Sequence, residues 1–190
     1  MKKLTTKKIA MIGVLSGITI LLGLTPLGYI PVGLVKVTTL PIPTIIGAII
    51  GGPLVGGFVG LAFGLFSLFQ NITVPTLLSF MFYNPLVSIL PRVLIGIITG
   101  YLYKLLNKTK LKDIFSTSIV GAVGAMVNTI GVLGMAYIFF ADKISAAKEG
   151  LNAATVLIGI AATNAPFEII VTTILVGLVC TGLLKSKKSS

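Results

Sequence analysis

Four polar side chains lie inside long apolar stretches of the sequence, and two of them carry opposite charges. Arg92 is the only arginine of the chain, and Asn128 lies in a later apolar stretch. Asn164 and Glu168 are four residues apart, so they share one face of a helix. An ionisable side chain at membrane depth is costly, and it faces other protein groups or a water-filled cavity. Because the planar guanidinium suits a carboxylate and the amides suit hydroxyl or amide groups, these residues predict a polar site for a small anionic molecule.

The same four residues also allow a purely structural interpretation. Arg92 and Glu168 can form a buried ion pair between two helices, while Asn128 and Asn164 form hydrogen bonds that hold helices together. The two interpretations are compatible, because a paired Arg92 can share its guanidinium with an incoming carboxylate. Glu168 would then hold Arg92 from the side opposite the ligand.

Further polar residues are expected to join Arg92. Counting back in steps of four gives two of them, on the same face of a helix over residues 82–103, and two more are expected near the outer mouth of the site. Lys36 is a competing cation, but we expect water to screen it. The four further binding residues predicted are Thr38, Tyr83, Asn84 and Ser88.

Two prolines lie beside the charged residues. Pro91 precedes Arg92 and has no backbone N–H, so the carbonyl of Val87 loses its helical partner and a kink or local opening is expected. Pro166 predicts the same in the last helix. Such breaks occur where helices line a cavity, although ordinary proline kinks are at least as common.

The composition is that of a membrane protein. Hydrophobic residues make up 55% of the chain and charged residues 10%, and the mean hydropathy is +1.09, whereas about a quarter of the residues in a soluble domain are charged. We expect one integral membrane domain over residues 1–190. Histidine is absent, only four acidic residues occur, and there is no G-x-x-x-x-G-K-[ST] motif for ATP. We therefore predict that the chain holds no metal or cofactor and is not an enzyme.

The basic residues indicate the topology. The net charge of +11 could suggest nucleic acid, but the basic residues are mostly grouped beside apolar stretches, within residues 2–8, 104–112 and 185–188. The positive-inside rule places all three groups in the cytoplasm, which argues against nucleic acid and requires an even number of spans between the groups. The segment Gly51-Gly52-Pro53 breaks the apolar region 42–69 into two short helices, and this makes the number of spans even. The prediction is an all-α, six-transmembrane-helix bundle with both termini cytoplasmic, over residues 9–24, 43–50, 54–69, 82–103, 114–140 and 155–184.

Three connections face outward in this topology, at residues 25–42, 70–79 and 141–154. The first is rich in proline and glycine, so no regular structure is expected there. It is also apolar, and we predict that it packs down on the bundle as a lid.

The first helix carries three small residues on one face, near its cytoplasmic end. These residues are Ala10, Gly13 and Gly17, and small residues at this spacing let another helix approach the backbone closely. Internal packing is one explanation. We predict the other, an interface with a second membrane protein.

Several of these features resemble the S components of energy-coupling factor (ECF) vitamin transporters, over most of the chain. The helix-one motif of that family, Ala-x-x-x-Ala, is matched here by Gly13-Val14-Leu15-Ser16-Gly17. Within the family, three segments look most like the pantothenate branch: PLGYIPVG, TTLPIPTIIGAIIGGP and NPLVSILPRVLIG.

The resemblance implies a subunit that captures a vitamin from outside and has no ATPase of its own. It would associate with a membrane T component and two cytoplasmic ATPases, which use ATP, and hand the vitamin inward. The alternatives are an S component for another water-soluble vitamin, or a small stand-alone channel or transporter. The two halves of the chain show no convincing internal repeat of the kind common in stand-alone transporters.

Overall fold

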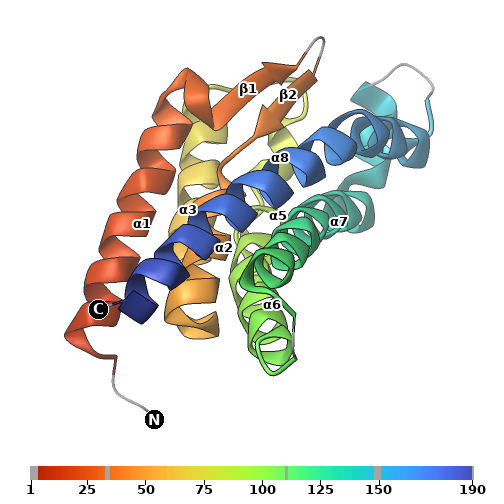
Figure 1. Cartoon of the computed structure of the whole chain (residues 1–190). Coiled ribbons are helices and arrows are strands. Elements are labelled where there is room, and N and C mark those ends of the chain that lie inside the picture. The colour runs from red at the N-terminus through yellow and green to blue at the C-terminus, as the bar shows by residue number, and fades with distance from the viewer. Residues whose placement is uncertain (1–3, 33–34, 110, 148–150, 190) are drawn as a thin grey trace.

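The computed structural model describes residues 4–32, 35–109, 111–147 and 151–189. These residues form a bundle of helices with one small β-hairpin at one end (Figure 1). The elements in chain order are α1 (Thr6–Leu24), η1 (Pro26–Gly28), β1 (Tyr29–Val32), β2 (Val35–Thr38), α2 (Pro41–Gly51), α3 (Pro53–Thr73), α4 (Ser79–Phe82), α5 (Pro85–Ser88), α6 (Leu90–Leu106), α7 (Asp113–Ala147) and α8 (Ala153–Ser189).

The fold is an all-α membrane bundle, as predicted. Five helical segments of the described part are long and apolar enough to cross a membrane, namely α1, α3, α5 together with α6, α7 and α8, while α2 is shorter, with 11 residues. Large apolar side chains point outward along the bundle: Ile138 is 75% exposed and Leu178 is 62% exposed. Such surfaces are unfavourable in water and suit a lipid environment. The count of six spans and the side of the termini stay predictions.

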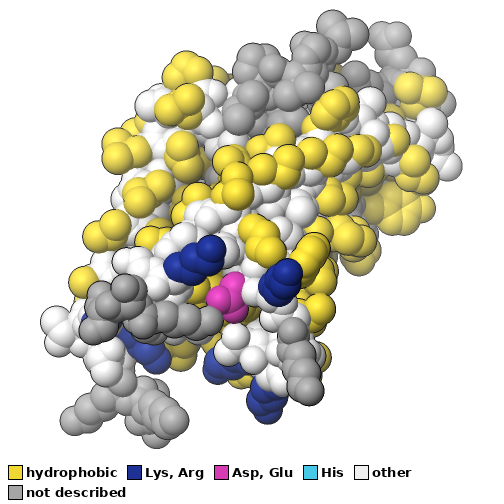
Figure 2. Space-filling view, in the orientation of Figure 1, with side chains coloured by type: hydrophobic (Ala, Val, Ile, Leu, Met, Phe, Trp, Pro, Cys, Tyr) yellow, Lys and Arg dark blue, Asp and Glu magenta, His cyan; other side chains and the backbone are white. Residues whose placement is uncertain are grey.

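Lysine side chains gather toward one end of the molecule (Figure 2), the end at which α1 begins and α8 ends (Figure 1). Hydrophobic side chains cover the flank between this end and the hairpin end. This distribution is typical of a protein whose cytoplasmic rim is basic.

The break between α2 and α3 is confirmed. Gly52 has a φ of +91°, which only glycine adopts readily, and it separates the end of α2 at Gly51 from the start of α3 at Pro53. Proline is well placed as the first residue of α3, because its missing N–H would have no helical partner there.

The single helix predicted over residues 82–103 is wrong in its first part. The chain forms α4, α5 and α6 instead, and Asn84 is the N-cap of α5, where its side chain accepts a hydrogen bond from the N–H of Leu86 (2.9 Å). A second break follows at Ile89, two residues before Pro91, so the local opening expected there is confirmed. The continuous polar stripe expected along this segment therefore does not exist.

The C-terminal helices also run further than predicted. Phe140 has non-helical backbone angles (φ −136°, ψ 18°), which marks a kink where we expected the helix to end, but α7 continues to Ala147. Much of the connection predicted at residues 141–154 is therefore helical.

Glycines bring the backbones of α3 and α6 into contact. A side chain at Gly96 would meet the backbone of Gly56, and one at Gly60 would meet the carbonyl of Arg92. This close approach fixes the main chain of Arg92 against α3, and it therefore fixes the position from which the Arg92 side chain extends.

The first outer connection is regular, contrary to the prediction. β1 and β2 pair in an antiparallel hairpin in which Tyr29 lies opposite Thr38. Its base is fixed by Thr39, whose N–H donates to the carbonyl of Gly28 (3.0 Å) and whose hydroxyl donates to that of Leu27 (2.8 Å). Antiparallel pairing satisfies backbone groups that an irregular loop would leave open.

Candidate functional site

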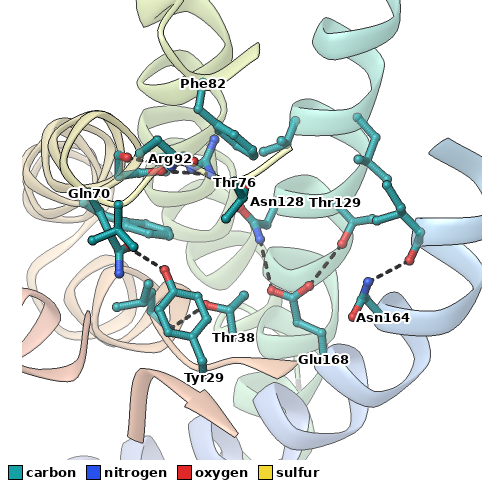
Figure 3. A pocket seen from close by; sticks show the side chains of 18 residues that line it. Tyr29, Thr38, Gln70, Thr76, Phe82, Arg92, Asn128, Thr129, Asn164 and Glu168 are labelled. Carbon is teal, nitrogen blue, oxygen red and sulfur yellow. Dashed lines mark hydrogen bonds between the residues drawn. The ribbon is translucent and has the colours of Figure 1, made fainter. Parts of the chain in front are cut away.

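A cavity of about 510 Å³ lies between the hairpin, α3, α6, α7 and α8. This volume is in the range of small-molecule sites. Figure 3 shows that polar side chains from all these elements converge on it. The polar residues that line it are Tyr29, Thr38, Ser67, Gln70, Asn71, Thr76, Arg92, Asn128, Thr129, Asn164 and Glu168.

The structure brings five of the eight predicted binding residues together around this cavity. The five are Thr38, Arg92, Asn128, Asn164 and Glu168. The lining does not include the other three. Asn84 caps α5, the hydroxyl of Ser88 donates to the carbonyl of Phe82, and Tyr83 is 46% exposed.

Arg92 is held firmly but keeps unused donors. Its Nη1 donates to the carbonyl of Val87 (2.7 Å), and its Nη2 lies 3.5 Å from the hydroxyl of Ser67. The guanidinium carbon lies 5.4 Å from the ring centre of Phe63 and 5.5 Å from that of Phe82, which is within cation–π range. The side chain is 6% exposed, and its Nε has no hydrogen-bond partner among the described residues.

Glu168 faces the cavity from α8 and is held by α7. Its Oε1 accepts from Nδ2 of Asn128 (3.0 Å) and its Oε2 accepts from the hydroxyl of Thr129 (3.3 Å). The structure shows no ion pair between Glu168 and Arg92, whose Nη1 donates to the carbonyl of Val87 instead. The oxygen of the Asn128 amide is buried and has no partner among the described side and main chains.

The two asparagines differ in what they connect. Asn128 joins α7 to α8 through Glu168, so the predicted interhelical hydrogen bond is present there. Asn164 instead donates from Nδ2 to the carbonyl of Ile160 on its own helix (3.1 Å). The side chain of Asn164 therefore stands at the cavity wall without tying two helices together.

Several residues at the hairpin side of the cavity are not among those predicted from the sequence. The hydroxyl of Tyr29 donates to Oε1 of Gln70 (2.6 Å), and Nε2 of Gln70 donates to the carbonyl of Gly23 (3.3 Å). Burial raises the pKa of Tyr29, so its hydroxyl stays protonated and able to donate. The signal for this group is the pair Gln70-Asn71 after an apolar run. The prediction puts both residues in the outward connection 70–79, but α3 continues to Thr73.

The arrangement offers several groups that can bind a small molecule. It offers a cation with a free N–H, an amide oxygen with a free acceptor position and a carboxylate. In the described ranges, no three His, Cys, Asp or Glu side chains lie close enough to hold a metal ion. A small polar molecule with an anionic group and hydroxyls or an amide would satisfy these open positions.

The small-residue face of α1 is uncovered. A Cβ added at Gly13 or Gly17 would meet no atom within 4 Å, and Ala10 and Gly13 are exposed. Packing against the described part of the chain therefore does not explain the two glycines.

Comparison with known proteins agrees with this architecture. Residues 7–180 match the family model described as ECF transporter, substrate-specific component. A pantothenate transporter PanT from Leuconostoc mesenteroides is 34% identical over 128 residues, which are 64% of this chain and 62% of that protein, so the chain covers less than two thirds of this relative. A pantothenic acid transporter PanT from Lactococcus lactis subsp. cremoris is 29% identical over 147 residues, or 70% of each protein.

The family match covers most of the chain, and the apolar helices agree with it. This family and both relatives are transporters rather than enzymes. The chain therefore belongs to the substrate-specific components of ECF transporters and is a multi-pass protein of the plasma membrane.

Proposed function

We propose that this chain captures pantothenate outside the cell with high affinity, as the vitamin-binding subunit of an ECF-type importer. The observation that carries the proposal is the cavity in which buried Arg92 keeps an unpartnered N–H. Pantothenate has one carboxylate, and an arginine shielded from water binds such a group strongly. The names of the two relatives support this choice of vitamin.

The rest of the ligand would meet the polar wall opposite Arg92. Pantothenate also carries two hydroxyls and an amide, and the free oxygen of Asn128 can accept from one of them. Glu168 and Asn164 offer further acceptors and a donor beside it. In this arrangement the β1–β2 hairpin, which contributes Tyr29 and Thr38, is the lid over the bound vitamin.

The experiment that tests this function is binding of labelled pantothenate to the purified chain, with other water-soluble vitamins as competitors. We expect saturable binding that excess unlabelled pantothenate removes and that riboflavin or biotin does not. If another vitamin competes better, pantothenate is the wrong ligand. If the chain alone in vesicles supports flux, it is a stand-alone transporter instead.

Energy for import would come from partners. We propose that the open face of α1, formed by Ala10, Gly13 and Gly17, docks against a membrane T component that also holds two ATPases. ATP is then used outside this chain, and the vitamin is released inward after docking.

The proposed topology has six spans, with both termini and the loop between α6 and α7 in the cytoplasm. The only cysteine, Cys180, is buried, so Lys108→Cys adds one accessible thiol. We expect an impermeant thiol reagent to fail to label Lys108→Cys in intact cells. Leu77→Cys is the control, because Leu77 is 63% exposed in the connection after α3 and should be labelled. Efficient labelling of Lys108→Cys from outside would overturn the topology.

A further inference from the structure

The guanidinium of Arg92 is held by a main-chain carbonyl that a regular helix would not leave free. In an α-helix, the carbonyl of Val87 accepts from the backbone N–H of residue 91. Residue 91 is proline and has no N–H. The carbonyl of Val87 accepts instead from Nη1 of Arg92, over 2.7 Å. Pro91 therefore removes one donor to the carbonyl of Val87, and the next residue, Arg92, supplies another.

Backbone hydrogen bonds flank this opening. The N–H of Ile89 donates to the carbonyl of Pro85 (2.7 Å), and the N–H of Val93 donates to the carbonyl of Ile89 (3.0 Å). Val87 is 0% exposed and Arg92 is 6% exposed. Water is therefore a poor substitute for either partner, and a buried carbonyl left without a donor is costly.

The same bond decides which donors of Arg92 remain for a ligand. A guanidinium carries five N–H groups in one rigid plane, so fixing one nitrogen and the orientation of that plane fixes the directions of the other N–H groups. Nη1 is fixed by Val87, while Phe63 and Phe82 contact the guanidinium. Nε has no partner in the described part of the chain, and Nη2 has only the long contact to Ser67.

We propose that Pro91 is a positioning residue for the ligand: by leaving the carbonyl of Val87 without a backbone donor, it anchors the guanidinium of Arg92 at the cavity wall with its remaining donors ready for a carboxylate. The inference rests on the proposed function, because it takes the ligand to be a carboxylate such as pantothenate. Pro91 itself touches no ligand, and its effect acts through Arg92.

The first test needs no ligand. Arg92 is the only arginine of the chain, so the rate of modification by phenylglyoxal reports on this one guanidinium. Pro91→Ala restores a backbone N–H that competes for the carbonyl of Val87. We expect Pro91→Ala to be modified several-fold faster than the wild type, because a competed hydrogen bond holds Arg92 less firmly.

The second test measures selectivity for the carboxylate. Pantothenol carries a hydroxymethyl group in place of the carboxylate of pantothenate. We expect Pro91→Ala to bind pantothenate about tenfold more weakly and pantothenol with little change, because only the carboxylate uses the fixed guanidinium. A variant that merely loosens the helix would weaken both ligands equally.

Two controls separate the missing N–H from the proline ring. Pro166→Ala makes the same change inside α8, where the proline is exposed, and it should leave both readouts near the wild type. Incorporating the α-hydroxy acid analogue of alanine at position 91 removes the N–H again without the ring, and it should restore slow modification and the preference for pantothenate.

The inference is overturned if Pro91→Ala keeps the wild-type modification rate and selectivity, or if the hydroxy acid does not restore them. Faster modification with unchanged selectivity also overturns it, because Arg92 would then be anchored without serving the ligand. If the wild type binds no pantothenate, the proposed vitamin fails, while the modification rates still test the anchor.

Discussion

Replacing Arg92 by glutamine weakens pantothenate binding on the order of a hundredfold, because a buried charge-assisted contact to the carboxylate is lost. Glutamine keeps an N–H donor for the carbonyl of Val87, so the fold near α6 is expected to survive. Calorimetric titration of the purified variant measures the affinity. Circular dichroism and thermal melting establish that the variant is folded.

Lys36→Gln is the matched control for the loss of one positive charge. Lys36 belongs to strand β2, and its side chain lies outside the described residues. Because we expect water to screen a cation on the outer hairpin, we predict an affinity change of several-fold at most. A folded Arg92→Gln protein that binds normally, or a larger loss in Lys36→Gln, would place the carboxylate elsewhere.

Filling the small-residue face of α1 abolishes uptake by the complete transporter and leaves vitamin binding intact. The double variant Gly13→Leu and Gly17→Leu puts bulk where no described atom lies within 4 Å, so the bundle itself is not strained. A partner helix that packs backbone to backbone against this face would be pushed away. Uptake is measured in cells that carry the T component and ATPases, and binding is measured on the isolated chain.

Gly134→Leu with Gly159→Leu is the control for this experiment. These glycines lie on α7 and α8 and are equally open, since a Cβ at either would meet nothing within 4 Å. This control should take up vitamin normally. If binding falls together with uptake in the α1 variant, the face serves the bundle rather than a partner.

The sequence predicted the features that depend on local chemistry. The break at Gly52 follows from glycine and proline in direct succession, and the opening before Arg92 follows from the missing N–H of Pro91. Burial of Arg92 and Glu168 follows from the cost of charges in lipid. Each of these arguments needs only a residue and its close neighbours.

The features that were missed depend on which segments or side chains pair with each other. The β1–β2 hairpin forms because the two strands pair with each other, which proline content alone argued against. Instead of pairing with each other, Arg92 donates to the carbonyl of Val87 and Glu168 accepts from Asn128 and Thr129, and no spacing in the sequence reveals these partners. Asn84 is different, because its role depends on local sequence. Asn followed by Pro is a recognisable helix start, whereas the prediction puts Asn84 in the polar stripe of one longer helix.

The most direct test of the account is a calorimetric comparison of pantothenate and pantothenol on the wild type and on Arg92→Gln. The central claim is that Arg92 recognises the carboxylate of the vitamin in the cavity. The wild type should therefore prefer pantothenate strongly, and Arg92→Gln should lose most of that preference while binding pantothenol almost as the wild type does. An equal preference for pantothenate in both proteins would contradict the claim.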